Sequence, residues 1–212
     1  MLKECKGHAS QVDPMAATNL SRPDSPSEGT MSAAAAHSKM IAGASAAEAE
    51  HTDRTPLLDK WVLYTHLPND DSWSIESYRR VMGFNTLEDG VALAKNLPEI
   101  AVKRCMLFLM RSEVEPRWED PHNKNGGCFS YKVANKQIVQ GWTNLMYSVM
   151  GETIFEDMAL NKQVTGITIS PKRSFSIIKI WLKDCKLQDP NKINAIPGLS
   201  LEGCVFKRHT AQ

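Results

Sequence analysis

The chain has 212 residues, 42% of them hydrophobic, which is enough to form the core of one sizeable domain. Its 25 Lys and Arg residues and 24 Asp and Glu residues leave a formal net charge of +1. No global electrostatic field therefore attracts the protein to duplex nucleic acid or to an anionic membrane. Any binding of an anion must depend on a local group of charges.

The sequence carries no signal for a membrane, a disulfide framework or a metal site. No stretch approaches the roughly 18 apolar residues of a membrane span, and the N-terminus lacks the pattern of a secretory signal. The 5 cysteines and 6 histidines are scattered, without the spacing of a metal-binding motif. We therefore expect a cytoplasmic protein with no membrane partner, no metal and no cofactor.

Residues 1–54 differ in composition from the rest of the chain. They are rich in Ala, Ser and Met and have almost no large aliphatic clusters. Such a segment buries too little apolar area to offset its ordering entropy. Residues 1–54 are therefore predicted to be a disordered tail, and residues 55–212 the folded domain. The alanine-rich run at 33–49 favours transient helix, but a face of methyl groups alone would anchor nothing.

Ordered elements are predicted along the rest of the chain. Large side chains on both faces of 61–65 are typical of a central strand, and Thr86 followed by acidic residues starts a helix that Pro98 ends. At 138–149 the apolar residues recur with the period of an amphipathic helix. In chain order, the sequence predicts a strand at 61–65, a helix at 86–97, strands at 105–110 and 128–133, a helix at 138–149, and strands at 164–169 and 175–182.

The balance of these elements indicates an α+β fold. Helices are few and hairpin signals are many. The run 170–174 separates two β-rich segments, and Gly126-Gly127 closes the loop 117–125 with turn chemistry typical of a connection between adjacent antiparallel strands. We therefore expect a curved antiparallel β-sheet with helices on one face, rather than parallel βαβ units.

Trp73, Trp118 and Glu119 together suit a flat, cationic base. Two indole rings can stack on both faces of a planar ring, and positive charge on that ring strengthens the attraction. An ionised carboxylate can accept both N–H groups on the Watson–Crick edge of guanine, and methylation at N7 supplies the positive charge. Taken alone, the pattern leaves open a structural alternative, in which the tryptophans fill a core and the acid lies in a solvated turn.

A set of motifs between Thr55 and Phe206 matches one known family in order and spacing. The most specific segment is Glu-Pro-Arg-Trp-Glu-Asp at 115–120, followed by Asn-Lys-Asn-Gly-Gly at 123–127. The other landmarks are Thr-Pro-Leu at 55–57, Lys-Trp at 60–61, Trp73, Thr-Leu-Glu-Asp at 86–89, Trp142, Gly-Glu at 151–152 and Ile-Trp at 180–181. With these residues the chain resembles the eukaryotic translation initiation factor 4E family, whose members bind the 5′ cap of mRNA.

The resemblance implies a curved antiparallel β-sheet backed by helices on its convex face, with a cap pocket on its concave face. In this family 7-methylguanosine is held between two tryptophans, which would be Trp73 and Trp118 here. Glu119 would then bind the guanine edge. The expected ligand is capped mRNA.

Further cap contacts are implied for Trp181, Lys172 and Arg173. Trp181 matches a tryptophan that lies near the methyl group in the family. Lys172 and Arg173 are the nearest matches to basic residues that contact the phosphates, and such charge-assisted contacts need no metal. A solvated turn is the alternative for these two cations. Because the chain stops soon after Phe206, contacts beyond the first nucleotide are not expected to follow the family pattern.

The resemblance also implies a dorsal surface that binds a helical peptide, either from a scaffold like initiation factor 4G or from a 4E-binding protein. This chain departs from the family there, with Gly90-Val91 in place of an aromatic pair and Thr143-Asn144 in place of Leu-Glu. A different register or an additional lateral surface is therefore expected. The residues assigned to partner binding are Pro56, Leu57, Val91, Trp142 and Tyr147. Core packing is the alternative for Trp142, because it lies on the apolar stripe of a helix.

The predicted function is non-enzymatic cap binding in translation initiation, and three alternatives stay open. A divergent isoform would occupy the cap and withhold mRNA as a repressor, and a paralogue unable to bind the cap would survive as an interaction scaffold. The third alternative is a carbohydrate-active enzyme, since tryptophans also stack on sugars. Its carboxylates would come from Glu113, Glu115, Glu119 and Asp120, but these crowd one segment, whereas glycoside hydrolysis needs two that face each other across the substrate.

Overall fold

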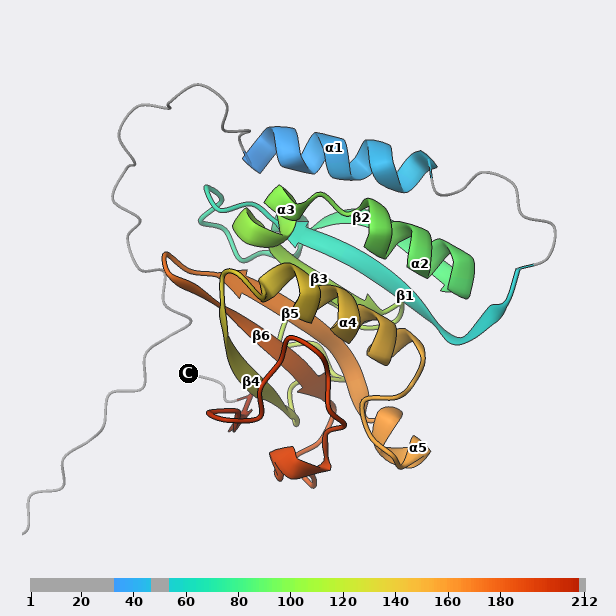
Figure 1. The fold of residues 1–212 in the computed structure, drawn as a ribbon, viewed down its shortest axis with the longest axis vertical. Coiled ribbons are helices and arrows are strands. Elements are labelled where there is room, and N and C mark those ends of the chain that lie inside the picture. The colour runs from blue at the N-terminus through green and yellow to red at the C-terminus, as the bar shows by residue number, and fades with distance from the viewer. Residues whose placement is uncertain (1–32, 47–53, 210–212) are drawn as a thin grey trace, which may run out of the picture. The chain divides into compact units, whose positions relative to one another are not determined.

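Seven antiparallel strands form one curved sheet in the order β2-β1-β3-β5-β6-β4-β7 (Figure 1). The computed structural model describes residues 33–46 and 54–209. The strands are β1 (Pro56–His66), β2 (Arg79–Thr86), β3 (Met106–Arg111), β4 (Gly127–Ala134), β5 (Val164–Pro171), β6 (Phe175–Leu182) and β7 (Val205–Arg208). The helices are α1 (Ala33–Ala46), α2 (Leu87–Asn96), α3 (Glu99–Arg104), α4 (Ile138–Met150) and α5 (Met158–Asn161), with short 3-10 turns at η1 (Ile75–Ser77) and η2 (Pro190–Lys192).

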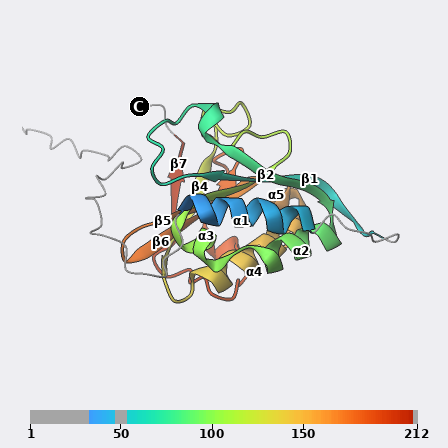
Figure 2. The ribbon, with the colours of Figure 1, turned by 90° about the horizontal axis from the view of Figure 1, so that it is seen from above.

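Helices α2, α3 and α4 cover one face of the sheet, and loops lie on the other face (Figures 1 and 2). The apolar stripe of α4 explains its position, because Ile138, Trp142 and Leu145 are each 0% exposed in the main core. The predicted α+β fold, with an antiparallel curved sheet and helices on one face, is confirmed.

The predicted pairing of the strands on either side of the Trp118 loop is wrong. β5 and β6 lie between β3 and β4, so the loop joins strands that are not neighbours. Gly126 and Gly127 serve close packing instead of a hairpin turn. A Cβ atom on Gly126 would lie 1.8 Å from the carbonyl oxygen of Leu182, and one on Gly127 would lie 2.5 Å from that of Lys207.

The segment Ala33–Ala46 differs from the predicted disordered tail, because it forms helix α1. Its Ala36 is 0% exposed and Met40 is 1% exposed, and both belong to the main core. The helix packs against α2, α3 and β2. Met40 supplies the anchor that a row of methyl groups would lack. The rest of the predicted tail, residues 1–32 and 47–53, lies outside the described residues.

A buried cation fastens the sheet to the segment after α4. Arg111 is 7% exposed, donates to Glu152 through Nη2 at 2.9 Å and to the carbonyl oxygen of Val164 at 2.6 Å, and pairs with Asp59. Its guanidinium also lies 4.8 Å from the ring centroid of Trp61. Burial raises the pKa of Glu152, and the attraction of Arg111 opposes that shift. Arg111 therefore offsets part of the cost of burying the Glu152 carboxylate.

Within the described residues, no helix is long and apolar enough to cross a membrane. The same part of the chain contains no group of three or more His, Cys, Asp or Glu side chains placed to hold a metal ion.

Candidate functional site

A second apolar cluster lies on the helix-free face of the sheet and gathers several of the predicted site residues. Side chains alternate along β3, so Leu107 and Leu109 enter the main core, whereas Phe108 and Met110 point to the opposite face. The buried members of this second cluster are Phe108, Met110, Val114, Cys128 and Trp181, with Tyr64, Tyr78, Met106 and Trp118 packed against them.

The loop that carries Trp118 is braced from within. The carboxylate of Asp120, which is 4% exposed, accepts a hydrogen bond from the backbone N–H of Glu115 at 3.0 Å. The side chain of Asn123, which is fully buried, donates to the carbonyl oxygens of Arg117 at 2.8 Å and Glu115 at 3.3 Å. These bonds fix the half-buried Trp118 ring against the second cluster before any ligand arrives.

Glu119 follows Trp118 and is exposed. Within the described chain its carboxylate accepts no hydrogen bond and forms no ion pair, so both oxygens are available to a ligand. Its negative charge helps to raise the pKa of Tyr78 to about 12, where burial is the larger cause and Arg117 opposes the shift. Tyr78, which comes from the segment after Trp73, therefore lies near Glu119.

Trp73 stacks on His66. Their ring centroids are 4.3 Å apart and their planes differ by 6°. His66 is 2% exposed and contacts the backbone oxygen of Ser72 through Nε2 at 2.8 Å. It therefore holds the backbone next to Trp73 as well as the indole ring. Trp73 itself is 41% exposed. Because His66 covers one face of the indole, the other face and the ring edges supply most of this exposed area.

The two tryptophan-bearing loops approach each other over the second cluster. Tyr78 lies 6.4 Å from Trp73 and 5.1 Å from Phe108, measured between ring centroids. Glu76 of η1 is close enough to Arg117 for that positive charge to help lower its pKa, although a hydrogen bond from Ser74 is the larger cause. Both loops rise on the side opposite the helices (Figure 2). The result is exposed indole surface on two loops, with an unpaired carboxylate beside one of them.

Trp181 forms part of the floor under these loops. It is 2% exposed, its Nε1 donates to Oγ1 of Thr168 at 3.1 Å, and its ring lies 4.7 Å from that of His209 with the planes tilted by 55°. His209 also contacts the carbonyl oxygen of Asn123 through Nδ1 at 2.8 Å. Burial lowers the pKa of His209; the hydrogen bond with Asn123 opposes this shift, and the positive charge of Lys179 adds to it. Both rings therefore belong to a packed surface.

The structure does not bring Lys172 and Arg173 to the cluster by any recorded contact, because both lie exposed in the turn between β5 and β6. Two other lysines lie close to the second cluster. Lys179 and Lys207 both act on the buried Cys128 thiol, where burial raises the pKa and these positive charges lower it. Lys179 precedes Trp181 by two residues on β6, a spacing that puts both on one face of a strand. That spacing was visible in the sequence and was missed.

A model of the family described as eukaryotic initiation factor 4E matches residues 56–205. The chain belongs to this family. Among its relatives, initiation factor 4E of Eremothecium gossypii is 34% identical over 148 residues, covering 66% of this chain and 68% of that protein. The Saccharomyces cerevisiae factor is 32% identical over 145 residues, covering 64% and 66%. Initiation factor 4E proteins are translation factors, so the chain is not an enzyme and the carbohydrate-active alternative is wrong.

Solved structures of initiation factor 4E proteins share the fold. Schistosome eIF4E complexed with m7GpppA and 4E-BP is 24% identical with a TM-score of 0.57, covering 63% of this chain and 74% of that chain. Caenorhabditis elegans eIF4E-3, in complex with the 4E-binding protein Mextli and a cap analog, is 21% identical with a TM-score of 0.57, covering 63% and 76%.

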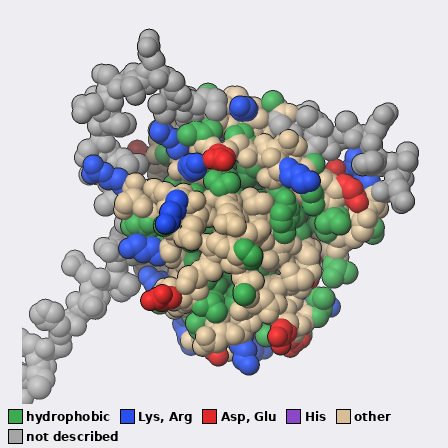
Figure 3. Space-filling model, in the orientation of Figure 1, with side chains coloured by type: hydrophobic (Ala, Val, Ile, Leu, Met, Phe, Trp, Pro, Cys, Tyr) green, Lys and Arg blue, Asp and Glu red, His purple; other side chains and the backbone are tan. Residues whose placement is uncertain are grey.

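The residues assigned to partner binding have different surroundings in this initiation factor 4E family member. Pro56 is exposed, whereas Leu57, Val91 and Tyr147 are half-buried, and α2 and α4, which carry Val91 and Tyr147, lie side by side. Seen from the helix side, hydrophobic side chains reach the surface among scattered charges of both signs (Figure 3). Trp142 is 0% exposed and packs in the core, so it offers no surface to a partner.

Two departures from the family pattern gain a structural role. A Cβ atom on Gly90 would lie 2.5 Å from the sulfur of Met150, so the glycine allows α2 to approach α4 closely. Asn144 donates to the carbonyl oxygen of Pro197 at 2.9 Å and ties α4 to the segment before β7. Both substitutions therefore contribute to packing within the chain.

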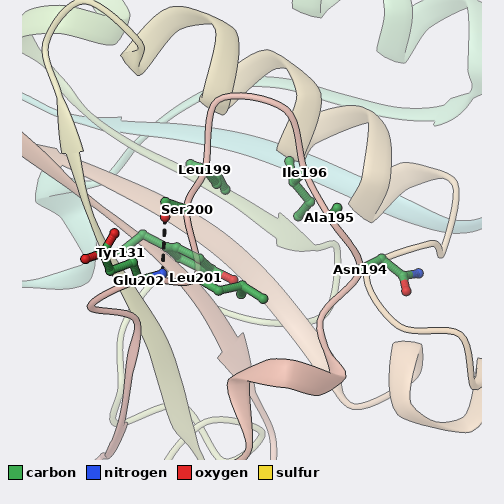
Figure 4. Close-up of a pocket in the computed structure, with 8 residues that line it drawn as sticks. All are labelled: Tyr131, Asn194, Ala195, Ile196, Leu199, Ser200, Leu201 and Glu202. Atoms are coloured by element: carbon green, nitrogen blue, oxygen red, sulfur yellow. Dashed lines mark hydrogen bonds between the residues drawn. The ribbon is translucent and has the colours of Figure 1, made fainter.

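A pocket of about 310 Å³ lies away from the predicted site (Figure 4). Its floor includes Tyr131, whose side chain belongs to the main core on the helix-bearing side of the sheet. None of the residues assigned to cap or partner binding lines it. The lining residues are Tyr131, Asn194, Ala195, Ile196, Leu199, Ser200, Leu201 and Glu202.

Proposed function

We propose that this protein binds the 7-methylguanosine 5′ cap of mRNA in the cytoplasm and acts in translation initiation or its regulation. The base would stack between Trp73 and Trp118, with the guanine edge on Glu119. The observation that carries the proposal is the approach of the two tryptophan loops over one apolar cluster, beside a carboxylate that no described residue occupies. Membership of the family and solved relatives that hold cap analogs support it.

In this proposal the phosphates lie beyond Trp181. Trp181 borders the methylated edge of the base, and Lys179 and Lys207 lie close enough to Cys128 of the cluster for their charges to lower the pKa of its thiol. Lys172 and Arg173 keep their proposed role as phosphate contacts, farther from the base, in the turn between β5 and β6. Contacts of this kind need only ammonium and guanidinium groups.

The test is a titration of tryptophan fluorescence with 7-methyl-GTP and, separately, with GTP. We expect strong quenching by the methylated nucleotide and much weaker binding of GTP, since only the methylated base carries a positive charge. Trp118→Ala and Glu119→Gln should each lose this binding, whereas Glu113→Gln, which changes an exposed acid of the same segment, should keep it. An equal response to both nucleotides, or no response, would refute cap recognition.

We also propose that a helical peptide of a partner binds the dorsal surface at Pro56, Leu57, Val91 and Tyr147. The partner is a scaffold like initiation factor 4G or a 4E-binding protein. Solved relatives hold 4E-BP or Mextli, which supports the second class. If a cap column retains the scaffold together with this protein, the role is initiation, and if it retains a repressor, the role is cap sequestration. Val91→Asp should release either partner without changing affinity for 7-methyl-GTP.

A further inference from the structure

One half of the sheet carries positive charge alone. Strands β4, β5, β6 and β7 contain no Asp or Glu, yet they carry Lys132, Lys179, Lys207 and Arg208. None of these four cations forms an ion pair within the described residues. In a chain whose formal net charge is +1, such segregation marks a local anion-binding surface.

The strand register puts three of these lysines on the face that carries Trp181. Lys207 pairs with Cys128, which is in turn the partner of Trp181 across β4 and β6. Lys179 lies two residues from Trp181 on β6, a separation of about 7 Å. Lys132 on β4 pairs with Ile177, so it lies diagonally across from Lys179 at about 7–8 Å. The lysines therefore continue from the candidate cap site toward the β5–β6 turn.

An aromatic ring lies at the far end of this row. Phe175, the first residue of β6, is half-buried, and Nζ of Lys132 lies 4.6 Å from its ring centroid. The exposed cations Lys172 and Arg173 stand directly before it in the turn. The distance along β6 from Trp181 to Phe175 is about 20 Å, or six residues. A flat ring among unpaired cations is the combination that single-stranded nucleic acid uses, because the cations hold the backbone and the ring stacks a base.

We propose that the surface from Lys179 to Phe175 binds the first nucleotides of the RNA chain that follows the cap. The inference rests on the proposed function, because the cap would deliver the RNA to one end of this row. RNA fits better than an acidic peptide or an anionic lipid, since the surface is continuous with the candidate base site and combines spaced cations with a stacking ring.

The test compares 7-methyl-GTP with a capped RNA of ten nucleotides and with the same RNA uncapped. We expect the wild-type protein to bind the capped RNA about 10-fold more tightly than 7-methyl-GTP at low salt. The double variant Lys132→Gln/Phe175→Leu should lose most of this gain and keep its affinity for 7-methyl-GTP. The salt slope for the capped RNA should fall by about 0.7, the share of one phosphate contact on a single strand. Lys95→Gln, an exposed lysine of α2, serves as the charge-matched control.

The outcomes separate the two proposals. Equal affinities of the wild-type protein for 7-methyl-GTP and capped RNA would overturn the inference and leave cap binding intact. A gain that persists in the double variant would also overturn it. Failure to bind 7-methyl-GTP would refute the proposed function. In that case, binding of uncapped RNA that depends on Lys132 and Phe175 would still support RNA binding at this surface. The absence of such binding would contradict the inference.

Discussion

His66 lies under Trp73 as a second, parallel ring, 4.3 Å away between centroids and 6° from coplanar. The same imidazole contacts the backbone oxygen of Ser72 at 2.8 Å, so it holds both the indole and the chain that carries it. His66 is thus placed to keep Trp73 in the orientation that a stacked base requires. It contacts no predicted ligand, so its role is to position Trp73.

The stack and the hydrogen bond of His66 can be separated by substitution. His66→Phe keeps a flat ring and loses the bond, whereas His66→Gln keeps a donor and loses the stack. We expect His66→Phe to retain the affinity for 7-methyl-GTP and His66→Gln to weaken it about 3- to 10-fold, because an aromatic pair contributes ~0.5–1.5 kcal/mol. The measurement is the fluorescence titration, with circular dichroism to verify folding. Loss of affinity in His66→Phe but not in His66→Gln would instead assign the effect to the hydrogen bond.

The positions of the main strands and of α4 could be predicted because their apolar residues follow one period throughout. The run at 138–149 corresponds to α4, and the segments at 164–169 and 175–182 form the β5–β6 hairpin. β2 was not predicted, because Arg79-Arg80 opens it and Gly83 interrupts its pattern. Strand order was harder still, since no local signal records that β5 and β6 insert between β3 and β4.

The candidate site was predicted where a compact motif carried it, and missed where it depended on register. Trp118 and Glu119 stand in one specific segment, so their neighbours were identifiable. His66 and Tyr78 were overlooked because nothing in the sequence predicts that the chain folds back to place them beside Trp73. Transient helix was expected in the alanine-rich run at 33–49, but the docking of α1 was missed for a related reason: its packing depends on Met40 meeting a surface built by distant elements.

Loss of Arg111 should destabilise the fold strongly. Arg111→Met leaves Glu152 buried without its cation, and breaking a buried pair in this way costs about 3–5 kcal/mol of unfolding free energy. Lys103→Met removes an exposed i,i+4 pair with Glu99 and should cost less than ~1 kcal/mol. Urea denaturation measures both. Addition of Glu152→Gln to Arg111→Met should recover part of the loss, and failure to do so would contradict the uncompensated charge as its cause.

His209 should make stability depend on pH on the acid side. Burial lowers the pKa of His209 in the folded protein below its ordinary value of 6.5, so the unfolded chain binds the proton more readily. Its stabilising contribution is therefore present above pH 6.5 and is lost as the pH falls through the folded pKa. Between pH 7.5 and 5.5, the urea midpoint should fall more for the wild-type protein than for His209→Phe. His37, whose pKa is also lowered by burial, contributes with the same sign in both proteins. An identical fall in the two would show that His209 does not titrate in this range.

Helix α1 should open independently of the sheet, because its anchors are few. Met40 is 1% exposed, whereas the neighbouring Ile41 is 44% exposed and serves as the matched control. Met40→Ala removes a buried side chain of a type whose loss costs about 2–5 kcal/mol in a core, but here the loss is confined to the docking of one terminal helix. Amide hydrogen exchange in Ala33–Ala46 should therefore become faster in Met40→Ala, while exchange in α4 stays as in the wild-type protein and Ile41→Ala changes neither. Equal acceleration in α1 and α4 would mean instead that α1 unfolds only together with the whole domain.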